Sequence, residues 1–435
     1  MTARRSESPL AEIERAVQAR AKDISLDMSG NGGAAKLRAL IDDEVARWSV
    51  DHKRGHRAFD LAEPELVAER ALRNLTGYGP LAPLLADDDV WEIMVNAPTE
   101  IFVRRHRGPS GYHDEVFHDD DHVVRTLTKI LDDAAGAHRK LDPAEGLQDA
   151  QLDDGARVHI VHGDISRGGH LMVNIRRFTG VAYKELAQLV EQDMLTGQAA
   201  GFLRAGVRAG LSIVVAGAPG SGKTTMLSCC AAEIDPALRV VMAEEVFEAD
   251  VPLPNVASMQ TRPARPERPA IDLRRLVAGF LRMAPDVAIV GEVRDREALP
   301  LLLTLSSGVK GLTTIHAGSA RQALTRLRFV CQLADAGSEI PMAALNTLVS
   351  EAIDIVVHCS RTRDGLRVTE IVAVEDLAGG PDATQFTVTD VFARPRGTEP
   401  LAWTGNLPVR AGRALREAGF DLHDLLDAGG GRARR

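Results

Sequence analysis

A phosphate-binding sequence lies near the middle of this chain of 435 residues. The apolar segment 212–216 runs into Gly-Ala-Pro-Gly-Ser-Gly-Lys-Thr-Thr at 217–225, which fills the pattern G-x-x-x-x-G-K-[ST]. Glycines let a backbone fold around a polyphosphate so that its N–H groups point at the oxygens, and the following helix adds its positive end. The sequence therefore predicts a site for a nucleoside triphosphate.

Within this loop, two side chains have expected roles of their own. Lys223 can reach the β- and γ-phosphates, and the hydroxyl of Thr224 can ligate Mg²⁺. We expect the whole loop to bind the nucleotide through Gly217, Ala218, Pro219, Gly220, Ser221, Gly222, Lys223, Thr224 and Thr225.

Three later apolar runs end at residues suited to triphosphate chemistry, namely Glu244, Glu292 and His316. The runs are Val240–Ala243, Val287–Val290 and Leu312–Ile315. Ligands of open parallel sheets bind beyond the carboxyl ends of the strands. If these runs and the segment before the loop are neighbouring parallel strands, all these groups lie around one phosphate.

Hydrolysis of the triphosphate needs such groups, because it is mostly positioning and charge stabilisation. We expect Glu244 to orient or deprotonate the attacking water. Glu292 is expected to hold Mg²⁺ or its water shell and to share the catalytic role. His316 could report the γ-phosphate through a hydrogen bond from its ring. Taken alone, each would be read as an ordinary strand-end residue; the phosphate loop favours the functional reading.

Arginines form a second group of candidates, because a guanidinium can stabilise the developing charge in cis or in trans. Pairing with surface carboxylates is the simpler role for most of them. Arg176 and Arg177 precede an inter-domain linker, and from there Arg176 could bind the nucleotide. The candidates in the core are Arg262, Arg265, Arg268, Arg275, Arg282 and Arg294.

Composition limits the class of protein. An apolar content of 45% and a charged content of 26% are those of a soluble globular chain. A net charge of −9 and 4% aromatic residues argue against a nucleic-acid partner. No apolar run approaches the roughly 20 residues of a membrane span, and the polar N-terminus lacks a signal-peptide pattern. We expect a cytoplasmic protein that associates peripherally with the cytoplasmic membrane through partners.

The elements that must position these residues fall into five sections. The fold class we expect is α/β: a P-loop core with a mostly parallel sheet, preceded by a smaller α+β domain and a helical N-terminal extension. The sections are 1–76, a helical and partly disordered extension; 77–180, the α+β domain; 181–209, a linker and helices; 210–360, the core; and 361–435, strands, a helix and a disordered tail.

The phosphate loop and the ends of the three later apolar runs are four stretches that, in this order, resemble the type II/type IV secretion ATPase superfamily. They correspond to its Walker A, Asp, Walker B and His boxes: Gly217–Thr225, Glu244-Glu245, Ile289–Arg294 and Thr313–Ala317. Further stretches are similar to the CpaF-like branch that serves tight-adherence (Flp-type) pili, and the resemblance covers roughly residues 75–410. These stretches are Gly79–Leu85, Glu92–Asn96, Leu152–Val158, Asn174–Phe178 and Leu281–Asp286.

This resemblance implies a homo-hexameric ring motor with a RecA-like core that uses ATP and Mg²⁺. Each nucleotide would sit between the N-terminal and RecA-like domains of one subunit. Arg139 and Arg157 match basic positions of the family's N-terminal domain, and Arg262 and Arg282 match those of its core. Domain rotation would move an inner-membrane platform protein, so that pilins or secreted substrates are assembled or exported.

Four departures and two alternatives accompany this interpretation. Glu245 stands where family members usually have aspartate, Val309 where a histidine is common, Asp295-Arg296 where a glycine pair is usual, and Gln151 where an arginine is usual. A RecA-type nucleic-acid motor is one alternative, and stimulation by single-stranded DNA rather than by a membrane partner would favour it. A non-hydrolysing scaffold that uses ATP only to assemble is the other, and steady-state turnover separates it from a motor.

Overall fold

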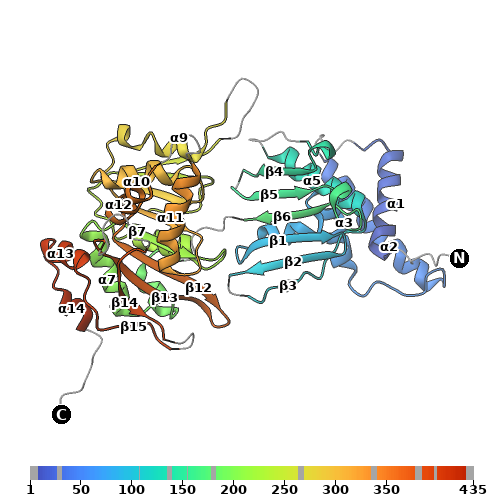
Figure 1. Cartoon of the computed structure of the whole chain (residues 1–435). Helices are drawn as coiled ribbons and strands as arrows, with labels where there is room; N and C mark the ends of the chain where they lie inside the picture. Colours follow the sequence, from blue (N-terminus) through green and yellow to red (C-terminus); the bar gives the residue numbers. More distant parts are fainter. Residues whose placement is uncertain are drawn as a thin grey trace, which may run out of the picture. The chain divides into compact units, whose positions relative to one another are not determined.

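The computed structural model describes residues 8–26, 32–106, 108–134, 140–153, 155–177, 183–262, 269–334, 340–377, 385–395 and 399–427. The chain forms two compact units, Met1–Thr179 and Gly180–Arg435 (Figure 1). The tail expected at 429–435 lies outside the described residues.

The first unit begins with three helices that pack on one another: α1 (Pro9–Asp23), α2 (Gly33–Lys53) and α3 (Pro64–Thr76). Ser8 caps α1 by accepting a hydrogen bond from the backbone N–H of Ala11 at 3.3 Å. The apolar residues recur at three- and four-residue spacing, which gives each helix one buried stripe. The stripes meet in a small core of Ile13, Val17, Leu37, Ile41, Val45, Trp48, Ala68 and Ala71.

An antiparallel six-stranded sheet forms the rest of the first unit, in the order β3-β2-β1-β6-β5-β4. Its strands are β1 (Val90–Ala97), β2 (Glu100–Arg105), β3 (Gly111–Tyr112), β4 (Leu147–Gln151), β5 (Arg157–Val161) and β6 (Met172–Arg176). The helix α5 (Asp120–Asp133) packs on alternate residues of the strands, because side chains of a strand alternate between its faces. The short elements are η1 (Gly79–Leu81), α4 (Ala82–Ala86), η2 (Pro143–Glu145) and η3 (Gly163–Ile165).

A buried polar junction joins the helices to the sheet within this unit. The Glu14 carboxylate of α1 accepts a hydrogen bond from Asn74 of α3 at 2.6 Å and lies 3.0 Å from Nε2 of His118. The ring of His122 is 1% exposed and lies 4.9 Å from the ring of His118. Burial lowers the pKa of His122 to about 4, and the charges of His118 and Arg125 act in the same direction.

The second unit is built on a nine-stranded sheet in the order β15-β14-β13-β12-β7-β11-β10-β8-β9. The six strands from β12 to β9 run parallel, and β13, β14 and β15 are antiparallel. The strands are β7 (Ile213–Gly217), β8 (Val240–Glu244), β9 (Val256–Gln260), β10 (Val287–Val293), β11 (Lys310–Ile315), β12 (Ile355–Thr362), β13 (Gly365–Val374), β14 (Val388–Ala393) and β15 (Ala402–Trp403). The division that we placed at 360/361 falls within β12, and the sheet continues past it.

Helices cover both faces of this sheet (Figure 1). Ile213 and Val215 face one core while Val214 and Ala216 face the other, so the central strand is apolar throughout its length. The helices of the first face are α6 (Leu186–Glu191), α7 (Gly197–Arg208), α8 (Lys223–Ala231), α13 (Arg410–Glu417) and α14 (Leu422–Asp427). Those of the second are α9 (Leu273–Val277), α10 (Ala298–Ser306), α11 (Ala320–Ala334) and α12 (Met342–Ala352). The expected α/β fold class is confirmed.

Within the parts of the chain that the structure describes, no helix combines the length and the apolar character that a bilayer crossing requires.

The buried ring of His122 predicts a stability that falls in acid. Its pKa is about 4 in the folded chain against an ordinary 6.5, so protons bind the unfolded chain more tightly. The stabilisation is complete above the unfolded pKa and is lost as the pH falls through the folded one, by up to about 3 kcal/mol. Urea unfolding of the full chain between about pH 4 and pH 7 measures it. His122→Gln cannot titrate and should give a flatter curve; equal slopes for both proteins would contradict the prediction.

Candidate active site

Four neighbouring parallel strands bring the predicted residues to one edge of the sheet. In the pairing of β7 with β11, Ala216 lies opposite Ile315. In the pairing of β10 with β8, Val290 lies opposite Ala243. The residues that follow these positions lie at the carboxyl edge of the sheet, with neighbouring strands about 4.8 Å apart. The convergence expected from the sequence is confirmed.

The loop after β7 requires its glycines. Gly217, Gly220 and Gly222 have φ of 157°, 70° and 87°, a region that residues with a side chain rarely adopt. A Cβ atom at Gly217 would lie 2.3 Å from the carbonyl oxygen of Cys359 and 2.3 Å from Oγ of Ser221. Gly222 then caps α8, so the N–H groups of the helix's first turn are available at the loop. The loop is therefore a backbone cradle that leaves no room for side chains at these points.

Unpaired polar groups in this cradle fit a phosphate. Oγ of Ser221 is buried and has no hydrogen-bond partner among the described residues. Thr224 and Thr225 are half-buried at the start of α8, while Ala218, Pro219 and Gly220 are exposed at the rim. A buried hydroxyl without a partner costs about 1–3 kcal/mol. The orphaned hydroxyl, the free helix end and the glycine cradle together match the donor set that a polyphosphate needs.

A buried lysine links the loop to two of the predicted strand-end residues. Lys223 is 7% exposed, and its Nζ donates to the carbonyl of Ala218 and to Nδ1 of His316, both at 3.1 Å. Nδ1 of His316 also lies 3.3 Å from the carbonyl oxygen of Gly217, so this nitrogen faces both the ammonium group and a carbonyl of the loop. Nε2 lies 2.6 Å from Oε1 of Glu292. Lys223, His316 and Glu292 therefore form one connected chain.

The charges and burial around Lys223, His316 and Glu292 favour the neutral form of His316. Burial lowers the pKa of His316, and the charge of Lys223 lowers it further, against the opposing effect of Glu292. Burial likewise lowers the pKa of Lys223, and the Glu292 carboxylate opposes that shift. A neutral imidazole between an ammonium and a carboxylate can accept from one and donate to the other.

A guanidinium holds the other side of the Glu292 carboxylate. Arg294 donates to Oε2 of Glu292 at 2.7 Å and to Oε2 of Glu245 at 2.8 Å. Burial on its own would raise the pKa of Glu292. The hydrogen bond and charge of Arg294, with the charges of His316 and Lys223, outweigh burial and lower that pKa. The lowered pKa favours the ionised carboxylate, and Arg294 fixes it through Oε2, while Oε1 is buried without a hydrogen-bond partner among the described residues.

Glu244, our first choice for the attacking water, is held by the backbone. It is 3% exposed, and its Oε1 accepts from the N–H groups of Glu248 and Ala249 at 3.1 and 3.0 Å. Its side chain lies against β10, because a Cβ at Gly291 would come within 2.8 Å of its Cγ. Glu244 is thus next to the strand that carries Glu292, but it is anchored more deeply than Glu292.

The two core arginines lie away from the loop of their own chain. Arg262 follows the outermost strand β9, donating to the carbonyl of Pro269 at 3.2 Å. That strand is four positions from β7, or about 19 Å. Arg282 lies in the short helix η4 (Phe280–Met283), whose last carbonyl accepts from Arg239, the residue directly before β8. Arg282 is therefore at the amino edge of the sheet, opposite the loop.

The arginines of the first unit have partners there. Arg176 donates to Glu92 at 3.1 Å, and in the register of β5 and β6 it lies opposite Arg157. Arg177 donates to the carbonyls of Leu84 and Val90 at 3.2 and 3.1 Å, so its guanidinium fixes the start of β1. Arg139, Arg265 and Arg268 lie outside the described residues.

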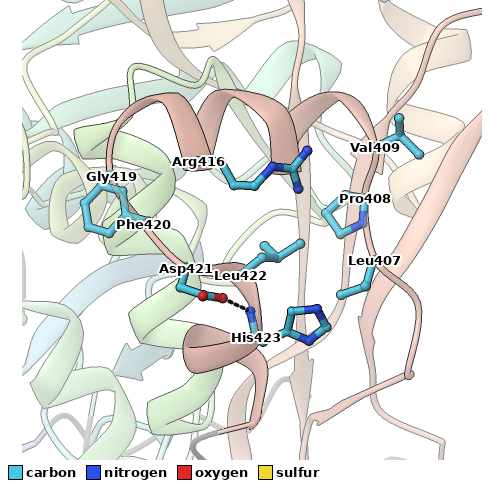
Figure 2. Close-up of a pocket in the computed structure, with 9 residues that line it drawn as sticks. All are labelled: Leu407, Pro408, Val409, Arg416, Gly419, Phe420, Asp421, Leu422 and His423. Carbon is cyan, nitrogen blue, oxygen red and sulfur yellow. Dashed lines mark hydrogen bonds between the residues drawn. The ribbon is translucent and has the colours of Figure 1, made fainter.

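Two further features concern metal binding and cavities. Among the described residues, no three or more His, Cys, Asp and Glu side chains are grouped so as to hold a metal ion. A hollow of about 590 Å³ lies at the C-terminal helices α13 and α14, where Asp421 accepts from the N–H of His423 (Figure 2). It is lined by Leu407, Pro408, Val409, Arg416, Gly419, Phe420, Asp421, Leu422 and His423, and none of these belongs to the phosphate loop.

Comparison with known proteins identifies a family. The family described as type II/IV secretion system protein matches residues 74–397. A protein of Mycobacterium tuberculosis, provisionally described as a conjugal transfer protein, is 31% identical over 331 residues, which cover 74% of this chain and 91% of that protein. The type IV secretion system protein PtlH of Bordetella pertussis is 31% identical over 305 residues, covering 65% of this chain and 88% of PtlH.

Solved structures with similarity to this chain include two ATPases. One is the VirB11 ATPase of the Brucella suis type IV secretion system, with 26% identity and a TM-score of 0.35, over 67% of this chain and 94% of that one. The other is the ATPase DotB of Legionella pneumophila, with 16% identity and a TM-score of 0.48, over 66% and 78% of the chains. Since both TM-scores are below 0.5, the assignment rests on the sequence matches.

The clamp on Glu292 predicts a pH-dependent effect of removing Arg294. Without the guanidinium, burial dominates and the pKa of Glu292 rises, so Arg294→Ala should shift the acidic limb of the ATPase pH profile to higher pH. Arg296→Ala removes an equally charged, exposed residue two positions away and should leave that limb unchanged. If the acidic limb of the pH profile is the same in Arg294→Ala as in the unmodified protein, Arg294 does not set the pKa of Glu292.

Proposed function

This chain belongs to the type II/IV secretion system protein family and is an ATPase, and we propose that it powers protein secretion or the assembly of a tight-adherence pilus. The observation that carries the proposal is the connected chain of Lys223, His316 and Glu292, which joins the phosphate loop to a fixed, ionised carboxylate. This arrangement would bring a γ-phosphate close to the group that acts on its attacking water.

In the proposed reaction the loop binds the triphosphate and orients it. The glycine cradle and the N–H groups of α8 surround the phosphate oxygens. Lys223 uses two of its three donors within the chain, on Ala218 and His316, which leaves a third for the β- and γ-phosphates. Oγ of Ser221 and the hydroxyls of Thr224 and Thr225 add further donors.

Magnesium would be held by Thr224, with Glu292 contributing through water, and when bound it neutralises charge on the phosphates. We now assign the attacking water first to Glu292 in place of Glu244, because the pKa of Glu292 is lowered, Arg294 fixes its Oε2, and its buried Oε1 has no hydrogen-bond partner among the described residues. Glu244, buried beside the same strand, would share that role by orienting the water. His316, which lies 3.1 Å from Nζ of Lys223 and 2.6 Å from Oε1 of Glu292, would transmit the position of the γ-phosphate to the carboxylate.

The placement of the arginines supports a ring of subunits. Arg282 lies at the edge of the sheet opposite the loop of its own chain, so it would act on the nucleotide of a neighbouring subunit. Arg262 lies beyond the outermost strand, and we place it too at the boundary with a neighbouring subunit. Arg176 would reach the nucleotide from the first unit, as the resemblance implies. We therefore propose a homo-hexamer.

The work done by this motor is proposed from the family resemblance. Stretches of the first unit are similar to the CpaF-like branch, so we assign the chain to tight-adherence pilus assembly, acting through inner-membrane platform proteins at the cytoplasmic face. The M. tuberculosis and Bordetella relatives carry names from conjugal transfer and type IV secretion, which makes protein export the second candidate.

Steady-state ATP turnover of the purified chain tests the assignment of residues. Lys223→Ala should weaken ATP binding by tenfold or more, on the order of the loss of a charged contact. Glu292→Gln should keep binding and lower kcat by about 10²–10⁴-fold, the range for a general base. Lys310→Ala, which removes an exposed lysine at the opposite edge of the sheet, should change neither.

Native mass measurement with and without a non-hydrolysable ATP analogue tests the ring, which should appear or be strengthened with the analogue. Turnover should rise on addition of the platform protein reconstituted in vesicles. Stimulation by single-stranded DNA instead would favour a nucleic-acid motor. An unmodified chain that forms rings but never turns ATP over would be a scaffold.

A further inference from the structure

The hairpin of β12 and β13 stands beside the phosphate loop. β12 pairs in parallel with β7, and Cys359 lies opposite Gly217, the last residue of β7. β12 continues for three more residues to Thr362, and β13 starts at Gly365. The end of this hairpin therefore runs past the edge of the sheet, alongside the loop.

Each positive-φ glycine of the loop meets one residue of this hairpin. The carbonyl of Cys359 lies against Gly217, where a Cβ would be 2.3 Å away. The side chain of Leu366 lies against Gly222, where a Cβ would be 2.8 Å from its Cδ1. Nε of Arg361 donates to the carbonyl of Gly220 at 2.8 Å. Of these three contacts, the one from Arg361 uses a charged side chain.

The Arg361 contact reaches Lys223 through the backbone. The C=O of Gly220 and the N–H of Ser221 belong to one planar trans peptide, so fixing the carbonyl fixes the direction of the N–H. That N–H donates to the carbonyl of Ala218 at 3.2 Å, closing a turn in which Pro219 and Gly220, with φ of 70°, are the central residues. The same Ala218 carbonyl accepts from Lys223.

We propose that Arg361 is a positioning residue of the ATP site, which pre-organises the phosphate loop by holding the Gly220–Ser221 peptide. This inference rests on the proposed nucleotide site and adds a residue that no loop or box pattern contains. Pre-organisation acts on the affinity for the phosphates and leaves the chemistry of hydrolysis to Glu292.

Measurement of nucleotide affinity distinguishes positioning of the loop by Arg361 from general attraction between a positive charge and the phosphates. Arg361→Ala should raise Kd for both ADP and ATP and KM for ATP by about tenfold, the loss of one charge-assisted hydrogen bond, with kcat at saturation within about twofold. Because Arg361 is exposed, the thermal midpoint should stay unchanged. Arg363→Ala removes an equal charge from the exposed turn of the same hairpin and should leave Kd as it was.

Chemical rescue completes the test. Guanidinium chloride at millimolar concentration should restore part of the affinity of Arg361→Ala and should not affect Arg363→Ala. Unchanged Kd in Arg361→Ala, or equal losses in both variants, would overturn the proposal. If Lys223→Ala loses nucleotide and Arg361→Ala does not, the ATP site stands and the positioning role fails. If the unmodified chain binds no nucleotide, the proposed function itself fails.

Discussion

A buried ammonium group is the constraint on which this site depends. Lys223 must sit deep in the loop to meet phosphates, and there its charge needs acceptors, because an unpaired charge is costly to bury. The groups nearest to it are the Ala218 carbonyl and the His316 ring, whose other nitrogen lies 2.6 Å from Glu292. Glu292 in turn requires Arg294, and Arg294 also holds Glu245. One buried charge thus determines the arrangement of side chains on three strands.

The strands that carry this arrangement could be predicted because they are buried on both faces. The runs that became β7, β8, β10 and β11 are continuous and apolar, and their order places them as parallel neighbours. β4 reads Leu-Gln-Asp-Ala-Gln and gave no such signal, since it is an edge strand with one face buried. β9, at the edge of the other sheet, was also missed, because its short run Val-Ala-Ser-Met-Gln is only partly buried and not continuously apolar. That β13 joins β12 in the core sheet depends on pairing between segments, which no local pattern specifies.

The same limit applies within the site. Lys223, Glu292 and His316 were predicted together because a strand-end rule places them on one edge. Two contacts were not predicted. The backbone hydrogen bonds to Glu244 depend on the conformation of a loop, and the contact of Arg361 with Gly220 depends on a strand pairing made in the folded chain. Arg294 was a candidate for stabilising developing charge, and its contact with Glu292 gives it a role in setting the ionisation of that carboxylate.

The unbroken sheet from β15 to β9 has a mechanical consequence. The helix α13 is tied to the start of β12, because Arg410 pairs with Asp354 at 3.1 Å and Glu375 accepts from the N–H groups of Val409 and Arg410. β12 is hydrogen-bonded to β7, and its far end touches the glycines of the loop. Each link of this route through the described residues is a strand pairing, an ion pair or a hydrogen bond, so a force applied at α13 would be transmitted to the strand beside the phosphate loop.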